Sequence, residues 1–76
     1  MTVELQRYHE LTNDAWRYFR KYAEQIPMTD EVWSAAVEEL NDIVVKHDSI
    51  QRMTRRTMMG VLDELEHLDR EAKGKE

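Results

Sequence analysis

A single proline, Pro27, interrupts a chain in which apolar residues otherwise recur at the three- and four-residue spacing of an α-helix. Proline disfavours the helical conformation in the residue before it, so a helix that reaches Pro27 ends there. The only other strong helix breakers are two glycines, and no alternating strand pattern lasts for more than a few residues. The sequence therefore predicts an all-α fold whose first helix ends just before Pro27.

Three apolar stripes define the predicted helices. They cover about residues 3–25, 30–47 and 49–72. The first stripe keeps its phase through the weak helix formers around Thr12, so we expect one continuous helix there. Thr29 is the expected N-cap of the second helix, and the two acidic residues after it complement the helix dipole.

These helices are expected to form one domain over residues 1–72, as a three-helix bundle or a helical hairpin that packs as a homodimer. Residues 73–76 have no apolar side chain and are expected to be a frayed polar tail.

The stretch KHDSIQRMTRRT, residues 46–57, leaves two interpretations open. Apolar residues keep heptad phase straight through it, which would allow one long helix with a polar middle. However, Asp48 and Ser49 are good helix caps, and Gln51 stands where it would complete a capping box with Asp48. We favour a break between two helices.

Size and charge favour association. The chain has 76 residues and no cysteine, so no disulfide adds to a core that supplies on the order of 3–5 kcal/mol at this length. The formal net charge is −5, but residues 26–45 carry −5 and residues 46–57 carry +3. A field that alternates in sign along the chain suggests self-complementarity, so the expected partner is a second copy or another protein.

Large apolar residues are the candidates for contact with a partner. Aromatic residues are enriched in interface hot spots, although a small core uses the same residue types. The predicted interface residues are Trp16, Tyr18, Trp33, Met58 and Leu65. The favoured function is a small non-enzymatic interaction or regulatory module.

Two alternatives involve nucleic acid. The basic segment 51–57 could serve a DNA-associated regulator, with polyanion contacts from Arg52, Arg55 and Arg56. A sequence pI of about 5.1 argues against it, because typical nucleic-acid-binding domains are strongly basic. The opposite reading is an acidic inhibitor that mimics nucleic acid through the carboxylates of the second helix. These are Asp30, Glu38, Glu39 and Asp42.

The sequence offers few residues suited to metal binding, pH sensing or catalysis. Glu64 and His67 have the spacing of a di-iron pair but fall outside the apolar stripe, and a second pair is missing, so no metal or other cofactor is expected. His47 lies in the second stripe and is expected to be a hydrogen-bonded core histidine or a helix-end cap rather than a pH switch. Because the chain has no nucleophile motif, phosphate loop or dinucleotide fingerprint, we expect no enzymatic activity.

The order of features resembles that of small uncharacterised helical proteins encoded on prophages and conjugative elements of Firmicutes. The segments that carry the resemblance are AWRYFRKY (15–22), TDEVWSAAVEEL (29–40) and GVLDELEHLDRE (60–71). The resemblance implies a bacterial accessory protein and brings no site residues with it. A cytoplasmic location is expected, because the chain has no long apolar run and its first ten residues lack a signal core.

Overall fold

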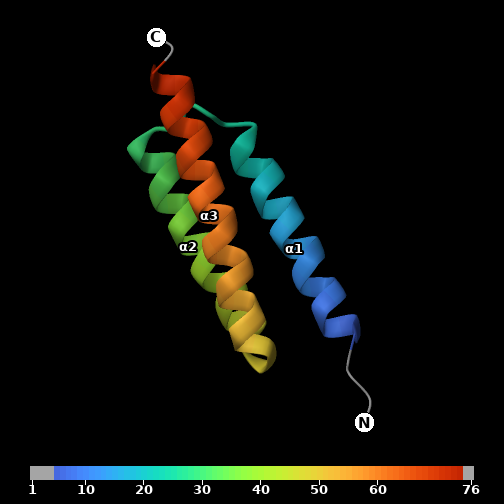
Figure 1. Ribbon diagram of the computed structural model, residues 1–76. Coiled ribbons are helices and arrows are strands. Elements are labelled where there is room, and N and C mark those ends of the chain that lie inside the picture. The colour runs from blue at the N-terminus through green and yellow to red at the C-terminus, as the bar shows by residue number, and fades with distance from the viewer. Residues whose placement is uncertain (1–4, 75–76) are drawn as a thin grey trace.

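The computed structural model describes residues 5–74, and within that range the chain folds into a bundle of three α-helices with no strand (Figure 1). The helices are α1 (Leu5–Ala23), α2 (Asp30–Lys46) and α3 (Gln51–Gly74), and a short 3-10 helix, η1 (Asp48–Ile50), joins α2 to α3. α1 and α3 run in the same direction, and α2 runs antiparallel to both (Figure 1). The predicted all-α three-helix fold is confirmed.

α1 is continuous, as predicted. Its weak point at Thr12 is accommodated because the Thr12 hydroxyl donates a hydrogen bond to the carbonyl of Tyr8, one turn earlier, at 2.9 Å. The helix ends at Ala23, and the Ile26–Pro27 peptide bond in the following loop is cis. The predicted stop before Pro27 is therefore confirmed, while the predicted first residues, 3 and 4, lie outside the described range.

α2 begins at the predicted cap. The Thr29 side chain accepts a hydrogen bond from the backbone N–H of Val32 at 3.3 Å, which satisfies one of the free donors of the first turn. The helix ends at Lys46, and the backbone N–H of the next residue, the C-cap His47, donates to the carbonyl of Ile43 at 3.1 Å.

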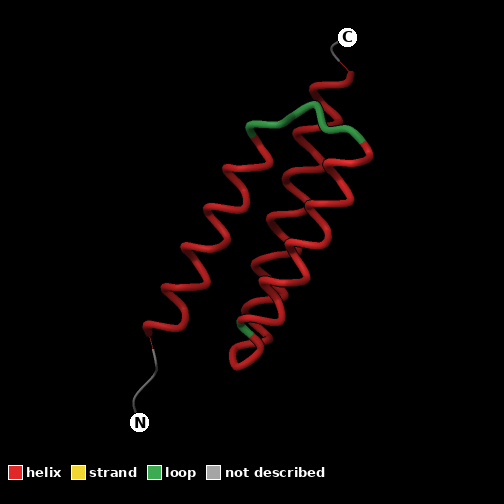
Figure 2. Tube along the Cα trace, turned by 180° about the vertical axis from the view of Figure 1, so that it is seen from behind, coloured by secondary structure: helices red, strands yellow, loops and turns green. Residues whose placement is uncertain are grey.

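The chain breaks between α2 and α3, so the single long helix is excluded and the favoured interpretation of residues 46–50 is confirmed (Figure 2). The expected capping box is not what makes the break. Instead, η1 closes on the backbone of His47, which accepts from the N–H of Ile50 at 3.1 Å. The buried hydroxyl of Thr54 then lies 3.0 Å from the carbonyl oxygens of both His47 and Ile50, which ties α3 to the end of α2.

The apolar stripes meet along the axis of the bundle. The fully enclosed side chains include Met58 and Leu65 of α3, which belong to one core cluster with buried residues of both other helices. Tyr18 of α1 is also buried, and its hydroxyl donates to the carbonyl of Ala36 in α2 at 2.8 Å. The core is thus shared by all three helices, and the Tyr18 hydroxyl adds a buried polar link between α1 and α2.

The predicted polar tail begins too early. α3 continues to Gly74, two residues beyond the expected end at residue 72, because Lys73 pairs with Asp69 one turn before it at 2.8 Å. Residues 75–76 lie outside the described range.

Candidate functional site

Several large apolar side chains stay on the surface after the bundle closes. They are Leu5, Tyr8, Trp16, Val37, Val45, Met53 and Met59. The most exposed are Val45 of α2, at 74%, and Leu5 of α1, at 72%. Five of the seven lie at the start of α1, the end of α2 or the first half of α3, and these segments gather toward the end of the bundle where α2 turns into α3 (Figure 1). Most of the exposed large apolar side chains therefore belong to segments at this end of the bundle.

The predicted interface residues differ in how exposed they are on the single chain. Trp16 is 60% exposed and stacks against Phe19, with ring centroids 6.3 Å apart, so it is accessible to a partner. Trp33 is half-buried. The other three, Tyr18, Met58 and Leu65, are core residues of the single chain, which corrects their assignment to an interface. An apolar stripe is equally suited to a core within one chain and to a contact between chains. Here the other helices of the same chain cover these three side chains.

Two of the three predicted polyanion contacts lie together. Arg52 and Arg56 line an open pocket of about 430 Å³ together with Tyr8 and Met53, at the α2–α3 turn. Arg55 does not line this pocket, and its guanidinium lies beside the Gln51 side chain, one turn earlier on α3. Within residues 5–74, neither Arg52 nor Arg56 forms an ion pair.

The acidic side of α2 remains mostly exposed. Asp30, Glu38 and Asp42 are on the surface, whereas Glu39 accepts from Lys21 of α1 at 3.2 Å. This hydrogen bond and the charge of Glu39 raise the pKa of the Lys21 ammonium. The acidic surface is therefore smaller than the sequence indicated, because one of its four carboxylates, Glu39, already pairs with a lysine of α1.

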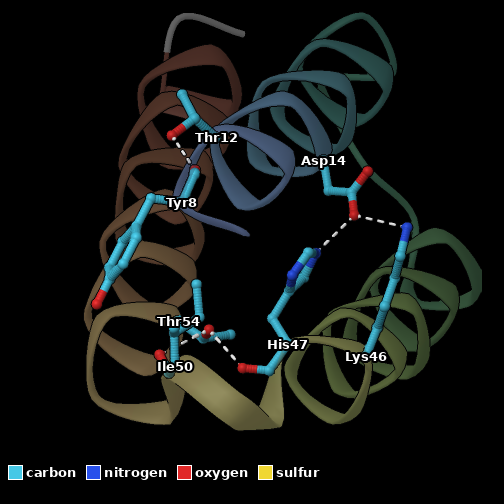
Figure 3. Close-up of polar contacts among 7 residues, drawn as sticks. All are labelled: Tyr8, Thr12, Asp14, Lys46, His47, Ile50 and Thr54. Atoms are coloured by element: carbon cyan, nitrogen blue, oxygen red, sulfur yellow. Dashed lines mark hydrogen bonds and ion pairs between the residues drawn. The ribbon is translucent and has the colours of Figure 1, made fainter. Parts of the chain in front are cut away.

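Asp14 joins α1 to the end of α2 (Figure 3). Its Oδ2 lies 2.7 Å from Nε2 of His47 and accepts from Nζ of Lys46 at 2.9 Å. Burial raises the pKa of the Asp14 carboxyl, but the hydrogen bonds from His47 and Lys46 lower it and prevail. His47 is only 5% exposed and also caps α2, so its predicted role as a hydrogen-bonded core histidine at a helix end is confirmed.

Asp69 is a second carboxylate anchor, which the sequence did not reveal. It is buried in α3, and its Oδ1 accepts from the backbone N–H of Met28 at 2.7 Å. Its Oδ2 accepts from Nε1 of Trp33 at 3.2 Å and from Nζ of Lys73 at 2.8 Å. Burial raises the pKa of this carboxyl, and the three hydrogen bonds lower it by more. Asp69 thus secures the α1–α2 loop and the start of α2 against α3.

No metal site emerges from the described residues. His67 is exposed and pairs with Glu71 at 3.3 Å, and Glu64 is also exposed. Within residues 5–74, no cluster of three or more histidine, cysteine or acidic residues is arranged to hold a metal ion.

Comparisons with known proteins return no match to any family model, any curated protein or any solved structure. Across residues 5–74, none of the helices has both the length and the apolar character required to cross a membrane.

Proposed function

We propose that the protein is a small, non-enzymatic interaction module that associates with a second copy of itself through the exposed faces of its helices. The observation that carries the proposal is the set of large apolar side chains left on the surface of an otherwise closed bundle, above all Val45 at 74% and Leu5 at 72% exposure. Isolated apolar residues on a surface are ordinary, but their concentration near the α2–α3 turn is typical of a contact surface.

Charge supports the same proposal. Arg52 and Arg56 of α3 lack ion-pair partners within residues 5–74, as do Glu38 and Asp42 of α2. A chain that displays unpaired charges of both signs on separate helices is complementary to its own copy. As a bacterial accessory protein it would work in the cytoplasm, and it would need no cofactor for this role.

Sedimentation velocity over a wide concentration range tests the proposal. The expected result is a mass that rises from monomer to dimer as concentration increases. A single monomeric species throughout, with a stable and cooperative thermal transition, would contradict it.

A second candidate function is contact with a single-stranded polyanion. The observation in its favour is the pocket that places Tyr8, an aromatic stacking surface, beside Arg52 and Arg56. Fluorescence anisotropy of a labelled single-stranded oligonucleotide at low salt tests it, with Tyr8→Ala and an Arg52→Glu/Arg56→Glu double variant for comparison. Binding that either variant abolishes would support this function, and no binding by the unmodified protein would eliminate it.

A further inference from the structure

Two exposed triads of residues, one on α2 and one on α3, have the same spacing and opposite charge. The α2 triad is Glu38, Asp42 and Val45, and the α3 triad is Arg52, Arg56 and Met59. In each triad the second residue follows the first by four positions and the third follows by seven, which places all three on one face of a helix. All six side chains are exposed.

We infer that the second copy docks its α2 triad against the α3 triad of the first, with each carboxylate of Glu38 and Asp42 meeting one guanidinium of Arg52 and Arg56. This assignment rests on the proposed self-association and specifies its surfaces. Because the rise per residue is the same in both helices, the two acidic residues and the two arginines are separated by the same distance, about 6 Å along the axis. Val45 and Met59 then meet at the third position, where each is more than half exposed in the single chain, at 74% and 52%.

The direction of the helices allows this contact to be made twice. Matching the triads in order requires α2 of one copy to run parallel to α3 of the other. α2 and α3 are antiparallel within a chain, so the second copy must be inverted, as it is when a twofold axis lies perpendicular to the bundle (Figure 1). A twofold axis makes the same contact reciprocally and closes the assembly at a dimer.

The apolar pair and the charged pairs have different tasks. Ion pairs at exposed positions contribute little affinity, but they select the partner and its orientation. Val45 and Met59 remove apolar surface from water, which is the favourable term in association. The expected dimer is therefore modest in affinity and is weakened by salt.

A charge exchange between the triads tests the inference. One variant carries Arg52→Glu and Arg56→Glu, so both of its triads are acidic. The other carries Glu38→Lys and Asp42→Lys, so both of its triads are basic. Each variant alone sets like charges against each other, and we expect its dimer dissociation constant to rise about tenfold or more. An equimolar mixture restores opposite charges at both contacts, and we expect it to form a heterodimer with at least the affinity of the unmodified protein.

Net charge alone cannot produce that result. Starting from a formal net charge of −5, the two arginine replacements subtract four units and the two lysine replacements add four, so both variants remain negative. A matched control, Arg20→Glu with Arg70→Glu, changes the net charge as the Arg52→Glu/Arg56→Glu variant does, but at exposed positions outside the triads. It is expected to leave the dimer intact. Circular dichroism of every variant verifies that the helices are retained.

Each outcome decides a separate question. A heterodimer that forms only in the mixture supports the pairing. If the unmodified protein dimerises but the exchange variants behave like it, the triads are not the interface and only the proposed self-association stands. If the unmodified protein is monomeric at every concentration, both the proposed self-association and the proposed pairing of the triads are wrong. A monomer that binds the single-stranded oligonucleotide, and loses it on Arg52→Glu/Arg56→Glu replacement, would overturn the pairing and assign these arginines to a polyanion.

Discussion

Trp33 of α2 and Asp69 of α3 are separated by 36 residues in the sequence and joined by a hydrogen bond of 3.2 Å from the indole Nε1 to the carboxylate Oδ2. The same carboxylate accepts a hydrogen bond from the backbone N–H of Met28, so one buried side chain of α3 is bonded both to the α1–α2 loop and to α2. A buried carboxylate is tolerated only when its lone pairs are satisfied, and here three donors satisfy them.

Replacement of Trp33 by phenylalanine is expected to destabilise the fold by about 1 kcal/mol, because the ring packing is retained while one donor to Asp69 is lost. Trp16→Phe is the matched control, since Trp16 is largely exposed, and we expect a change within about 0.5 kcal/mol. Urea denaturation followed by circular dichroism measures both. Equal losses in the two variants would show that the hydrogen bond to Asp69 contributes nothing.

Replacement of Met58 by alanine is expected to cost about 2–5 kcal/mol, because Met58 is fully enclosed and its truncation leaves a cavity. For a chain of this size that is most of the stability, so the thermal transition should broaden or disappear. Met53→Ala provides the comparison on the exposed side of the same helix and is expected to melt like the unmodified protein. A cooperative, unshifted transition in Met58→Ala would contradict the core described above.

Acid is expected to destabilise the fold through Asp14 and Asp69. Both carboxyls have a pKa below the ordinary value of 3.8 in the folded chain, because hydrogen bonds outweigh the effect of burial. Such groups stabilise the fold fully above the unfolded pKa, and this contribution is lost as the pH falls through the lower folded pKa. Thermal melts between neutral pH and pH values below 3.8 should therefore show a decline in stability that begins as the pH approaches 3.8 from above.

Asp14→Asn should reduce the size of this acid-dependent decline while lowering stability at neutral pH, since the amide cannot pair with His47 and Lys46 as a charge. The exposed Asp63→Asn is the control and should leave the profile unchanged. A profile for Asp14→Asn that parallels that of the unmodified protein would mean that Asp14 is not one of the groups responsible.

Gly60→Ala is expected to stabilise the protein by about 0.5–1 kcal/mol, because alanine favours helix over glycine and an added Cβ meets no atom within 4 Å. Gly74, the last residue of α3, provides a control whose replacement should have little effect. Denaturant titration measures both. A loss of stability, or a loss of self-association, on Gly60→Ala would indicate that another helix approaches this glycine closely.

Local signals predicted the helices well. Pro27, the Thr29 cap and the polar residues after Lys46 each act on the backbone within a few residues, so their effects were readable without knowledge of the tertiary structure. The periodicity could not reveal which stripe residues face their own chain. Tyr18, Met58 and Leu65 were assigned to an interface because a buried stripe and a shared stripe have the same pattern.

Both carboxylate anchors were missed for a similar reason. Asp14 and Asp69 are acidic residues in a chain with many acidic residues, and their partners are distant in the sequence. A signal was nevertheless present, because Asp69 follows the fully enclosed Leu65 by four positions and therefore lies on the apolar face of α3. An acidic residue on such a face needs buried donors, and that requirement predicts tertiary hydrogen bonds even when it cannot name them.

The two anchors also fix how far each helix is displaced along its neighbours. Asp14 holds α1 against the last residues of α2, while Asp69 holds α3 against the first. A displacement of either helix along its axis by a single turn, about 5.4 Å, would separate one of these carboxylates from its donors. The carboxylate would then be buried without hydrogen-bond partners. Leucine and methionine side chains alone would tolerate such a shift. The two carboxylates therefore select one helix register among several that would bury similar amounts of apolar surface.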